Sequence, residues 1–450
     1  MKCLSAGDDR VGKIVQKKEL PPDGRCRLSG FVVVHEADGR VLLKNILTRQ
    51  VYALTPAEWA LVQTGDLSCP QVRELAQLRF LVEPEHDEAA RYALTLAVLR
   101  TMENRKPGIV SYTILPTTGC NARCVYCYEE GWPVKVMSPE TADAVADFIC
   151  RTKREGMIKL HWFGGEPLCA PKTISRICRI LQDRGVKYDS AIVTNATLLT
   201  PELVKEAVDL WHLSGAQVSM DGARQDYEAR KRYLNPEQHN YEKAMEGVTL
   251  LLDAGIRVSI RCNFDGENLP RLQDFMEDCR DRFGERKNIC VYVEQLRPVP
   301  DGEESWMMYQ AGDDAELYEE SLGLVAPDRA GDRRLTMSYC IADPYGSALV
   351  IDPLGGLHAC EHKADDTPIG TVFDAEPPSR AAEKASLKIA EECKSCPYLP
   401  ECTPFRKSCP VVDEHCRRQM EMWTKRSLTH LLKWVATAES DGDEPGNGCK

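Results

Sequence analysis

The feature that most constrains the fold is a regular alternation of strand-like and helix-like segments between residues 110 and 296. Short runs rich in apolar and β-branched residues recur at 111–116, 158–163, 190–195, 217–221, 258–263 and 289–296. Helical patterns separate them. One begins after Ser138 and another ends before Gly255, which are residue types typical of helix ends. Strands that alternate with helices pair in parallel through right-handed crossovers. The pattern predicts an α/β fold, a partial (β/α)6 barrel with its functional residues at the carboxyl ends of the strands.

The blocks on either side of this barrel have different patterns. Before it, two apolar runs meet at Asp38-Gly39, a hairpin signal, and a third strand and two short helices follow. We therefore expect an N-terminal winged-helix-like α+β domain at 1–105 and the barrel at 106–330. After it, short strands and cysteine-rich loops indicate a C-terminal domain at 331–438. The polar, Gly-rich residues 439–450 are expected to form a disordered tail.

Composition excludes several classes of protein. The chain is 43% apolar and 28% charged, with a formal net charge of −12, whereas a general nucleic-acid binder needs a basic face. No run approaches the roughly 18 apolar residues of a membrane span. The polar start lacks the apolar core of a signal peptide. We expect a cytoplasmic enzyme that has neither nucleic acid nor membrane as a partner.

Cysteine usage is unusual, because the chain has 20 cysteines and no signal peptide. In a reducing compartment, clustered thiols are more often metal ligands than disulfides. Half of the cysteines form two sets, one just after the first barrel strand and one in the C-terminal block. They are Cys120, Cys124 and Cys127, and Cys340, Cys360, Cys393, Cys396, Cys402, Cys409 and Cys416.

The first set lies on one loop, with spacings of four and three residues. Three thiolates on a four-iron cluster leave one iron open for a substrate or cofactor. A closed zinc site needs four ligands, and no fourth cysteine or histidine is close in sequence. A zinc site completed from a distant part of the chain is the alternative.

This CxxxCxxC loop resembles that of the radical S-adenosylmethionine (SAM) superfamily, and the ends of the next strands agree with it. Gly164-Gly165-Glu166-Pro167 is similar to the GGEP motif, whose backbone receives the amino group of SAM. Thr194-Asn195 is similar to the TNG segment, although Ala196 replaces its glycine. Ser219-Met-Asp221-Gly222 is similar to the SxDG motif, and Arg261-Cys-Asn263-Phe-Asp265 to the end of the family's fifth strand.

The resemblance implies roles for individual residues. Ser219 and Arg230 would hold the SAM carboxylate, although Arg232 is close to Arg230, and a solvated helix arginine is the alternative. Tyr126 would lie near the adenine. The cluster and SAM would generate a 5′-deoxyadenosyl radical, with electrons from a donor such as a flavodoxin or ferredoxin. No side chain stands out as a catalytic acid or base.

The second set of cysteines resembles the SPASM extension of radical SAM enzymes, which holds two auxiliary four-iron clusters. By this resemblance, Cys340, Cys360 and Cys409 would hold the first, and Cys393, Cys396, Cys402 and Cys416 the second, which makes three [4Fe-4S] clusters in all. The interval from Cys402 to Cys409 is longer than in the family. An open iron in the first auxiliary cluster would bind a substrate thiolate, unless His358 or His362 completes it. A zinc ribbon at 393–416 is the alternative.

Relatives with this architecture mostly modify peptides or proteins. We therefore expect a maturase of a ribosomally made precursor peptide that joins a cysteine sulfur to a carbon in a thioether. The N-terminal block would capture a leader peptide by strand addition, or else serve only as a packing extension. The alternatives are oxidation of cysteine or serine to formylglycine, carbon–carbon or carbon–oxygen crosslinking, and a peptide-binding scaffold with structural clusters. Asp265, Asp343 and Asp352 could assist proton removal but are more often structural.

Overall fold

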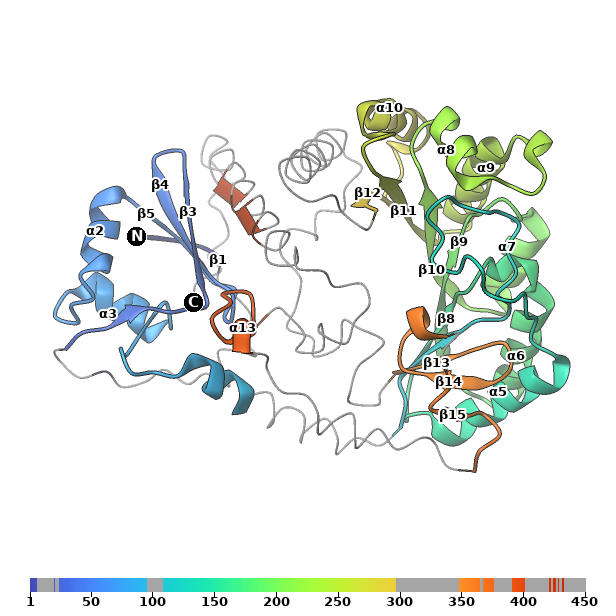
Figure 1. Ribbon diagram of the computed structural model, residues 1–450, viewed down its shortest axis with the longest axis horizontal. Coiled ribbons are helices and arrows are strands. Elements are labelled where there is room, and N and C mark those ends of the chain that lie inside the picture. Colours follow the sequence, from blue (N-terminus) through green and yellow to red (C-terminus); the bar gives the residue numbers. More distant parts are fainter. Residues whose placement is uncertain are drawn as a thin grey trace. The chain divides into compact units, whose positions relative to one another are not determined.

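The computed structural model describes residues 1–5, 20, 24–94, 108–296, 348–364, 367–375 and 391–400, together with 421, 424–425, 428 and 431–432. Contacts divide the chain into two compact units (Figure 1). The smaller unit contains Met1–Glu103, Asp328–Tyr339 and Ala385–Lys450, and the larger contains Asn104–Pro327 and Cys340–Lys384. No described helix is long and apolar enough to cross a membrane.

The larger unit is built on a nine-stranded sheet in the order β12-β11-β10-β9-β8-β7-β13-β14-β15. Six strands pair in parallel and in sequence order. They are β7 (Ser111–Ile114), β8 (Ile158–Trp162), β9 (Tyr188–Thr194), β10 (Leu213–Met220), β11 (Arg257–Phe264) and β12 (Ile289–Gln295). The prediction of an α/β fold with a parallel sheet is confirmed. Among the described strands β12 and β15 form the two edges, so the sheet does not close into a ring.

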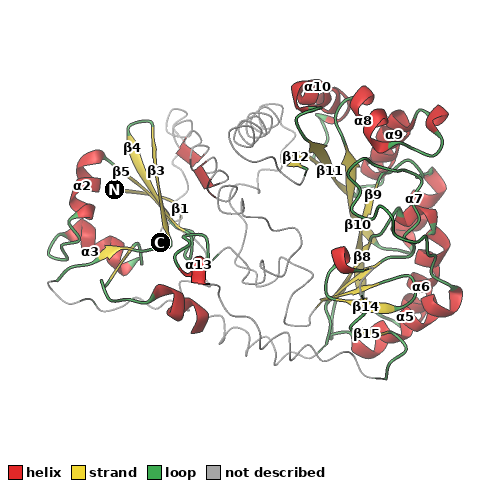
Figure 2. Cartoon of the chain, in the orientation of Figure 1, coloured by secondary structure: helices red, strands yellow, loops and turns green. Residues whose placement is uncertain are grey.

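Helices cover one face of this sheet (Figures 1 and 2). They are α5 (Pro139–Thr152), α6 (Pro171–Asp183), α7 (Pro201–Asp209), α8 (Arg224–Lys231), α9 (Asn240–Asp253) and α10 (Leu272–Phe283). As expected, Ser138 caps α5 by accepting a hydrogen bond from Thr141 N at 3.1 Å, and Gly255 follows α9 with φ +77°. Buried residues such as Leu160, Val218 and Ile260 form one core with these helices.

The other face of the sheet is more polar. Ser219 and Arg261 lie side by side in register on β10 and β11, and both are only half-buried. On the same face Tyr292 donates to Gln217 Oε1 at 2.9 Å. A parallel sheet is usually apolar on both faces. A polar inner face therefore suits the binding of a polar molecule.

Three later strands extend the sheet beyond β7. They are β13 (Ala348–Ile351), β14 (Gly356–His358) and β15 (Gly370–Thr371). β13 pairs with β7 in parallel, and β14 and β15 continue the sheet in antiparallel. The sequence pattern predicts these strands as part of the C-terminal domain. They join the barrel sheet because β7, the first strand of the barrel, has an open edge.

The smaller unit contains an antiparallel sheet in the order β1-β5-β4-β3 and a two-stranded pair, β2-β6. The predicted hairpin is present, and Asp38 and Gly39 both have positive φ, at 49° and 69°, as a two-residue type I′ turn requires. The strands are β1 (Lys2–Ser5), β2 (Arg27–Leu28), β3 (Val32–Ala37), β4 (Arg40–Asn45), β5 (Val51–Leu54) and β6 (Leu81–Val82), and the helices are α2 (Pro56–Gln63) and α3 (Pro70–Gln77). Thr55 and Glu58 form a capping box at the start of α2. The winged-helix assignment remains a prediction.

The two faces of the four-stranded sheet contact different parts of the chain. Leu43 and Leu54 pack in one core with α2 and α3. On the other face, Val33 packs with Tyr398 and Cys396, next to the short helix α13 (Glu391–Lys394). The segment that carries Cys393 and Cys396 thus packs on the N-terminal sheet, within the smaller unit. The domain expected at 331–438 remains a prediction.

Candidate functional site

The loop after β7 carries Cys120, Cys124 and Cys127. Its base is closed by a β-bridge between Thr117 and Val136. None of the three cysteines is in a disulfide, and all are partly buried. Burial raises the pKa of Cys120 to about 12 and also raises the pKa values of Cys124 and Cys127. A raised pKa means that each thiol holds its proton more firmly, and metal binding releases that proton.

The chemistry of this donor set fits an iron–sulfur cluster, because cysteine thiolates are the ligands of such clusters. A four-iron cluster distributes its thiolate ligands over separate iron atoms. Three thiols on one half-buried loop provide such ligands, and Ala122 N already donates to Cys120 Sγ at 3.4 Å, the kind of hydrogen bond that tunes clusters.

Backbone hydrogen bonds join the cysteine loop to the end of α8 and the residues just after it. Arg123 N donates to the carbonyls of both Lys231 and Arg232 at 3.0 Å, and Val125 N donates to the Arg230 carbonyl at 3.0 Å. In the other direction, Leu234 N donates to the Asn121 carbonyl at 2.9 Å. The residues on both sides of Cys124 are thus held by the end of α8.

The glycines after β8 let this strand end approach the loop closely. Gly164 has φ +109°, and a Cβ on it would meet the Thr117 carbonyl oxygen at 2.4 Å. A Cβ on Gly165 would meet the Gly119 carbonyl oxygen at 2.5 Å. Glu166 N donates to that same oxygen at 2.9 Å. Only glycine fits at these two positions.

Glu166 accepts three hydrogen bonds through its carboxylate, which is 1% exposed. Oε1 accepts from Thr194 Oγ1 at 2.7 Å and from Leu168 N at 3.0 Å, and Oε2 accepts from Asn195 N at 2.7 Å. Pro167 begins a 3-10 turn directly after it. The carboxylate is fully engaged, so the role of Glu166 in this structure is to hold the ends of β8 and β9 together.

Asn195, at the end of β9, is joined to the cysteine loop by its side chain. Asn195 Nδ2 donates to Asn121 Oδ1 at 2.8 Å, and Asn121 Nδ2 donates to Thr197 Oγ1 at 3.0 Å. The next residue, Ala196, has φ +63°, in the region where the similar family motif has glycine. The turn after β9 is therefore left-handed despite the alanine.

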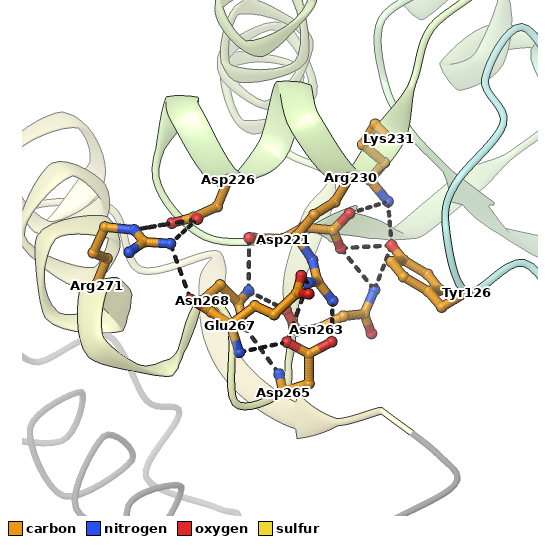
Figure 3. A network of polar contacts seen from close by, with 10 residues as sticks. All are labelled: Tyr126, Asp221, Asp226, Arg230, Lys231, Asn263, Asp265, Glu267, Asn268 and Arg271. Atoms are coloured by element: carbon orange, nitrogen blue, oxygen red, sulfur yellow. Dashed lines mark hydrogen bonds and ion pairs between the residues drawn. The ribbon is translucent and has the colours of Figure 1, made fainter.

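A buried polar network lies between the loop and the ends of β10 and β11 (Figure 3). Tyr126 Oη donates to Asp221 Oδ1 at 2.5 Å, and Asn263 Nδ2 donates to both at 3.0 and 3.2 Å. Asn268 Nδ2 donates to the Asp221 carbonyl at 2.8 Å. Lys231 completes the network as the counter-ion of Asp221, with Nζ 3.6 Å from Oδ2.

Arg230 and Ser219, expected to share the SAM carboxylate, have different surroundings. Arg230 is bound by Asp265 at 2.7 and 3.1 Å and by Glu267 at 3.2 Å, and its guanidinium lies 5.9 Å from the centre of the Tyr126 ring. Ser219 lies on the inner face of the sheet beside Arg261. Arg261 makes one hydrogen bond to the described residues, from Nε to Asn263 Oδ1 at 3.0 Å.

The second set of cysteines is only partly described. Cys340, Cys402, Cys409 and Cys416 lie outside the described residues, and Cys393 and Cys396 belong to the smaller unit. In the larger unit, Cys360 is 7% exposed. Of the two candidate additional ligands, His358 has Nε2 2.9 Å from Asp352 Oδ2. His362 packs against Tyr128 of the cysteine loop, with ring centres 4.3 Å apart.

Sequence reasoning missed Lys231 and Asn121. A signal for Lys231 was available, because Asp226, Tyr227, Arg230 and Lys231 form one helical stripe, and all four are buried. Asn121 offered no comparable signal, since its partner Asn195 is distant in sequence.

A comparison with known protein families finds a match over the residues that form this site. Residues 114–279 match the family model described as the radical SAM superfamily. This stretch, which contains the cysteine loop and the ends of β8 to β11, is therefore similar to radical SAM domains, and the parallel sheet is consistent with the partial barrel of such domains.

Two curated relatives cover similar stretches. The AdoMet-dependent heme synthase of Methanosarcina barkeri is 28% identical over 201 residues, 44% of this chain and 53% of the relative. A probable GTP 3',8-cyclase of Methanocaldococcus jannaschii is 29% identical over 185 residues, 38% of this chain and 56% of the relative. The chain thus spans about half the length of these relatives, which carry different activities.

Among solved structures, one described as native anSMEcpe with bound AdoMet and Cp18Cys peptide matches 74% of this chain and 100% of its own, with a TM-score of 0.57 and 16% identity. This likeness concerns the fold.

Proposed function

We propose that this chain is a radical SAM enzyme that modifies a ribosomally made peptide, and that it joins a cysteine sulfur of that peptide to a carbon in a thioether. The observation that carries the proposal is the seating of three thiols, held by backbone and side-chain bonds, at the carboxyl ends of β7 to β10. This is the end of a parallel sheet at which (β/α) enzymes bind their ligands.

In this proposal Cys120, Cys124 and Cys127 would hold a [4Fe-4S] cluster, which together with SAM would supply the radical chemistry that removes a substrate hydrogen. The chain's own residues bind and orient the cofactor. The Gly164-Gly165 turn, pressed against the loop, would present its backbone to the SAM amino group. Ser219 on the inner face would hold the carboxylate with a cationic partner. The motif resemblance names Arg230, and the contacts favour Arg261, which lies beside Ser219.

Several features support a peptide substrate. The solved fold neighbour carries a peptide together with AdoMet in its description. The second set of cysteines would provide two auxiliary clusters that bind a substrate thiolate or accept the electron left after crosslinking. The smaller unit has a four-stranded antiparallel sheet with β3 at one edge, and such an edge can receive an extended peptide by strand addition. A flavodoxin or ferredoxin would supply the electrons.

The atoms balance in this reaction. A new carbon–sulfur bond replaces one C–H and one S–H bond. The hydrogen atom from carbon would leave with the radical derived from SAM, the thiol proton would pass to solvent, and an auxiliary cluster would accept the remaining electron. Each crosslink therefore removes two hydrogen atoms from the peptide and one reactive thiol.

The test is anaerobic co-expression with a short cysteine-rich peptide encoded next to the gene, followed by mass measurement of the peptide after its thiols are alkylated. A thioether is expected to remove two hydrogens and one alkylation site per event. The matched control is the variant with Cys120, Cys124 and Cys127 replaced by alanine, which should leave the peptide unchanged. Hydrogen loss with every thiol still reactive would favour a carbon–carbon or carbon–oxygen crosslink. An unmodified peptide beside abundant 5′-deoxyadenosine would favour formylglycine formation on another substrate.

A further inference from the structure

Lys231 is a buried cation beside the cysteine loop (Figure 3). Its side chain is 3% exposed, and Nζ lies 3.6 Å from Oδ2 of Asp221, which is 0% exposed. Nζ also donates to Tyr126 Oη at 2.9 Å and lies 5.5 Å from the centre of the Tyr126 ring. A buried charge is costly unless it is paired and hydrogen-bonded, and Asp221 and Tyr126 supply that compensation.

Both the backbone and the side chain of Lys231 contact the loop. Its carbonyl accepts from Arg123 N at 3.0 Å, and the neighbouring Arg230 carbonyl accepts from Val125 N at 3.0 Å. The side chain reaches Tyr126, the residue before Cys127. The ammonium is thus anchored to the stretch of loop that includes Cys124 and Cys127.

The loop needs a positive charge nearby. Three thiolates bring negative charge into a half-buried site, and a four-iron cluster that they hold becomes more negative by one charge when it is reduced. The Lys231 ammonium donates to Tyr126 Oη at 2.9 Å, on a residue between Cys124 and Cys127, and so lies where it can offset part of that charge.

The Asp221 carboxylate is held so that it only partly offsets this cation. Oδ1 accepts from Tyr126 and Asn263, whereas Oδ2 faces Lys231 without a hydrogen bond from any described residue. The two opposite charges are therefore held in place by their neighbours. Removal of Lys231 makes the electrostatic potential at the loop more negative, and removal of Asp221 makes it more positive.

We propose that Lys231 is a positioning residue that places one positive charge against the cysteine loop, and that the Lys231–Asp221 pair sets the reduction potential of the cluster held there. This inference rests on the proposed function, because it concerns that cluster. On reduction, one electron passes from a one-electron donor to the cluster without breaking a bond. Lys231 stabilises the added negative charge, and Asp221 opposes it.

The test compares Lys231→Met with Asp221→Asn, which remove opposite charges at similar side-chain size. Each full-length variant is reconstituted anaerobically with iron and sulfide and titrated with dithionite, with electron paramagnetic resonance as the readout. The signal missing from the variant with alanine at Cys120, Cys124 and Cys127 belongs to the loop. We expect a more negative midpoint potential for Lys231→Met and a less negative one for Asp221→Asn. A merely structural role gives no such opposition, because both substitutions break the same network.

Two further variants keep the test decisive. Lys172→Met removes an exposed lysine of α6 and should leave the potential unchanged. If Lys231→Met binds no cluster, Lys231→Arg should bind one with nearly the wild-type potential. Asp221→Asn still shows whether the midpoint potential shifts in the expected direction. Shifts of the same sign, no shift, or a less negative potential for Lys231→Met would overturn the inference. Failure of the proposed function is distinguished by the wild type itself, which would then bind no loop cluster or cleave no SAM.

Discussion

Glu166 Oε1 accepts a hydrogen bond from Thr194 Oγ1 at 2.7 Å and so joins the ends of β8 and β9 beside the cysteine loop. Glu166→Gln replaces one carboxylate oxygen, which accepts a hydrogen bond, with an amide nitrogen, which donates one. A buried donor then faces another buried donor. We expect it to lower the free energy of unfolding of the larger unit by about 1–3 kcal/mol. Thermal unfolding measures this, with Glu155→Gln, an exposed glutamate, as the unaffected control. Equal stability of both variants would refute the joining role of Glu166.

Gly165 is expected to tolerate no side chain. The Cβ of Gly165→Ala would meet the backbone oxygens of Thr118 and Gly119 at 2.6 and 2.5 Å, so the turn and the loop must separate. We expect a loss of about 1–3 kcal/mol in stability and less iron bound after reconstitution. Gly215→Ala in β10 is the control, because the one atom of the described residues near its Cβ is the Arg257 carbonyl oxygen, at 3.8 Å. If Gly165→Ala binds iron like the control, the close contact has no role in forming the site.

The sequence predicted the local elements well, because their signals lie within a few residues. All six parallel strands fall where apolar runs were found, and the Asp38-Gly39 turn has the backbone angles that its residues favour. Pairings between distant segments carry no such signal. The addition of β13 to β7 and the packing of Cys396 on the N-terminal sheet depend on which edges and faces are left open after the local elements have formed.

A similar limit applies at the site, because a motif names residues and not their contacts. The resemblance predicts that Arg230 holds the SAM carboxylate, and this remains a prediction. In the structure Arg230 pairs with Asp265 and Glu267. A lysine next to an arginine in a helix is usually solvated. Lys231 is buried because the packing of α8 and β10 brings it close to Asp221, which provides its counter-ion.

The two candidate arginines can be separated by experiment. Arg230→Met leaves Asp265 without its bidentate partner and should lower the free energy of unfolding by about 2 kcal/mol. This figure allows for screening by solvent, because Asp265 is partly exposed. Arg261→Met removes a cation beside Ser219 that has one hydrogen bond to the described residues. We expect it to weaken SAM binding by the reconstituted chain more than tenfold, and Arg230→Met less. Equilibrium dialysis with labelled SAM gives both dissociation constants, and the reverse order would assign the carboxylate to Arg230.

The auxiliary clusters can be counted by iron content. Replacement of Cys393 and Cys396 by alanine should remove about a third of the iron that the wild type binds, because one of three clusters loses thiolate ligands. The loop cluster should remain and still cleave SAM. Unchanged iron and zinc content in this variant would show that these cysteines hold no metal, and a loss of zinc in place of iron would favour a zinc ribbon.

The central claim is that the loop of Cys120, Cys124 and Cys127 supports reductive cleavage of SAM. The most direct measurement is the yield of 5′-deoxyadenosine from the reconstituted full-length chain incubated anaerobically with dithionite and SAM. We expect this product from the wild type and none from the variant with alanine at all three positions. A wild-type chain that holds its full iron and yet yields no 5′-deoxyadenosine, or a triple variant that yields as much as the wild type, would contradict the account.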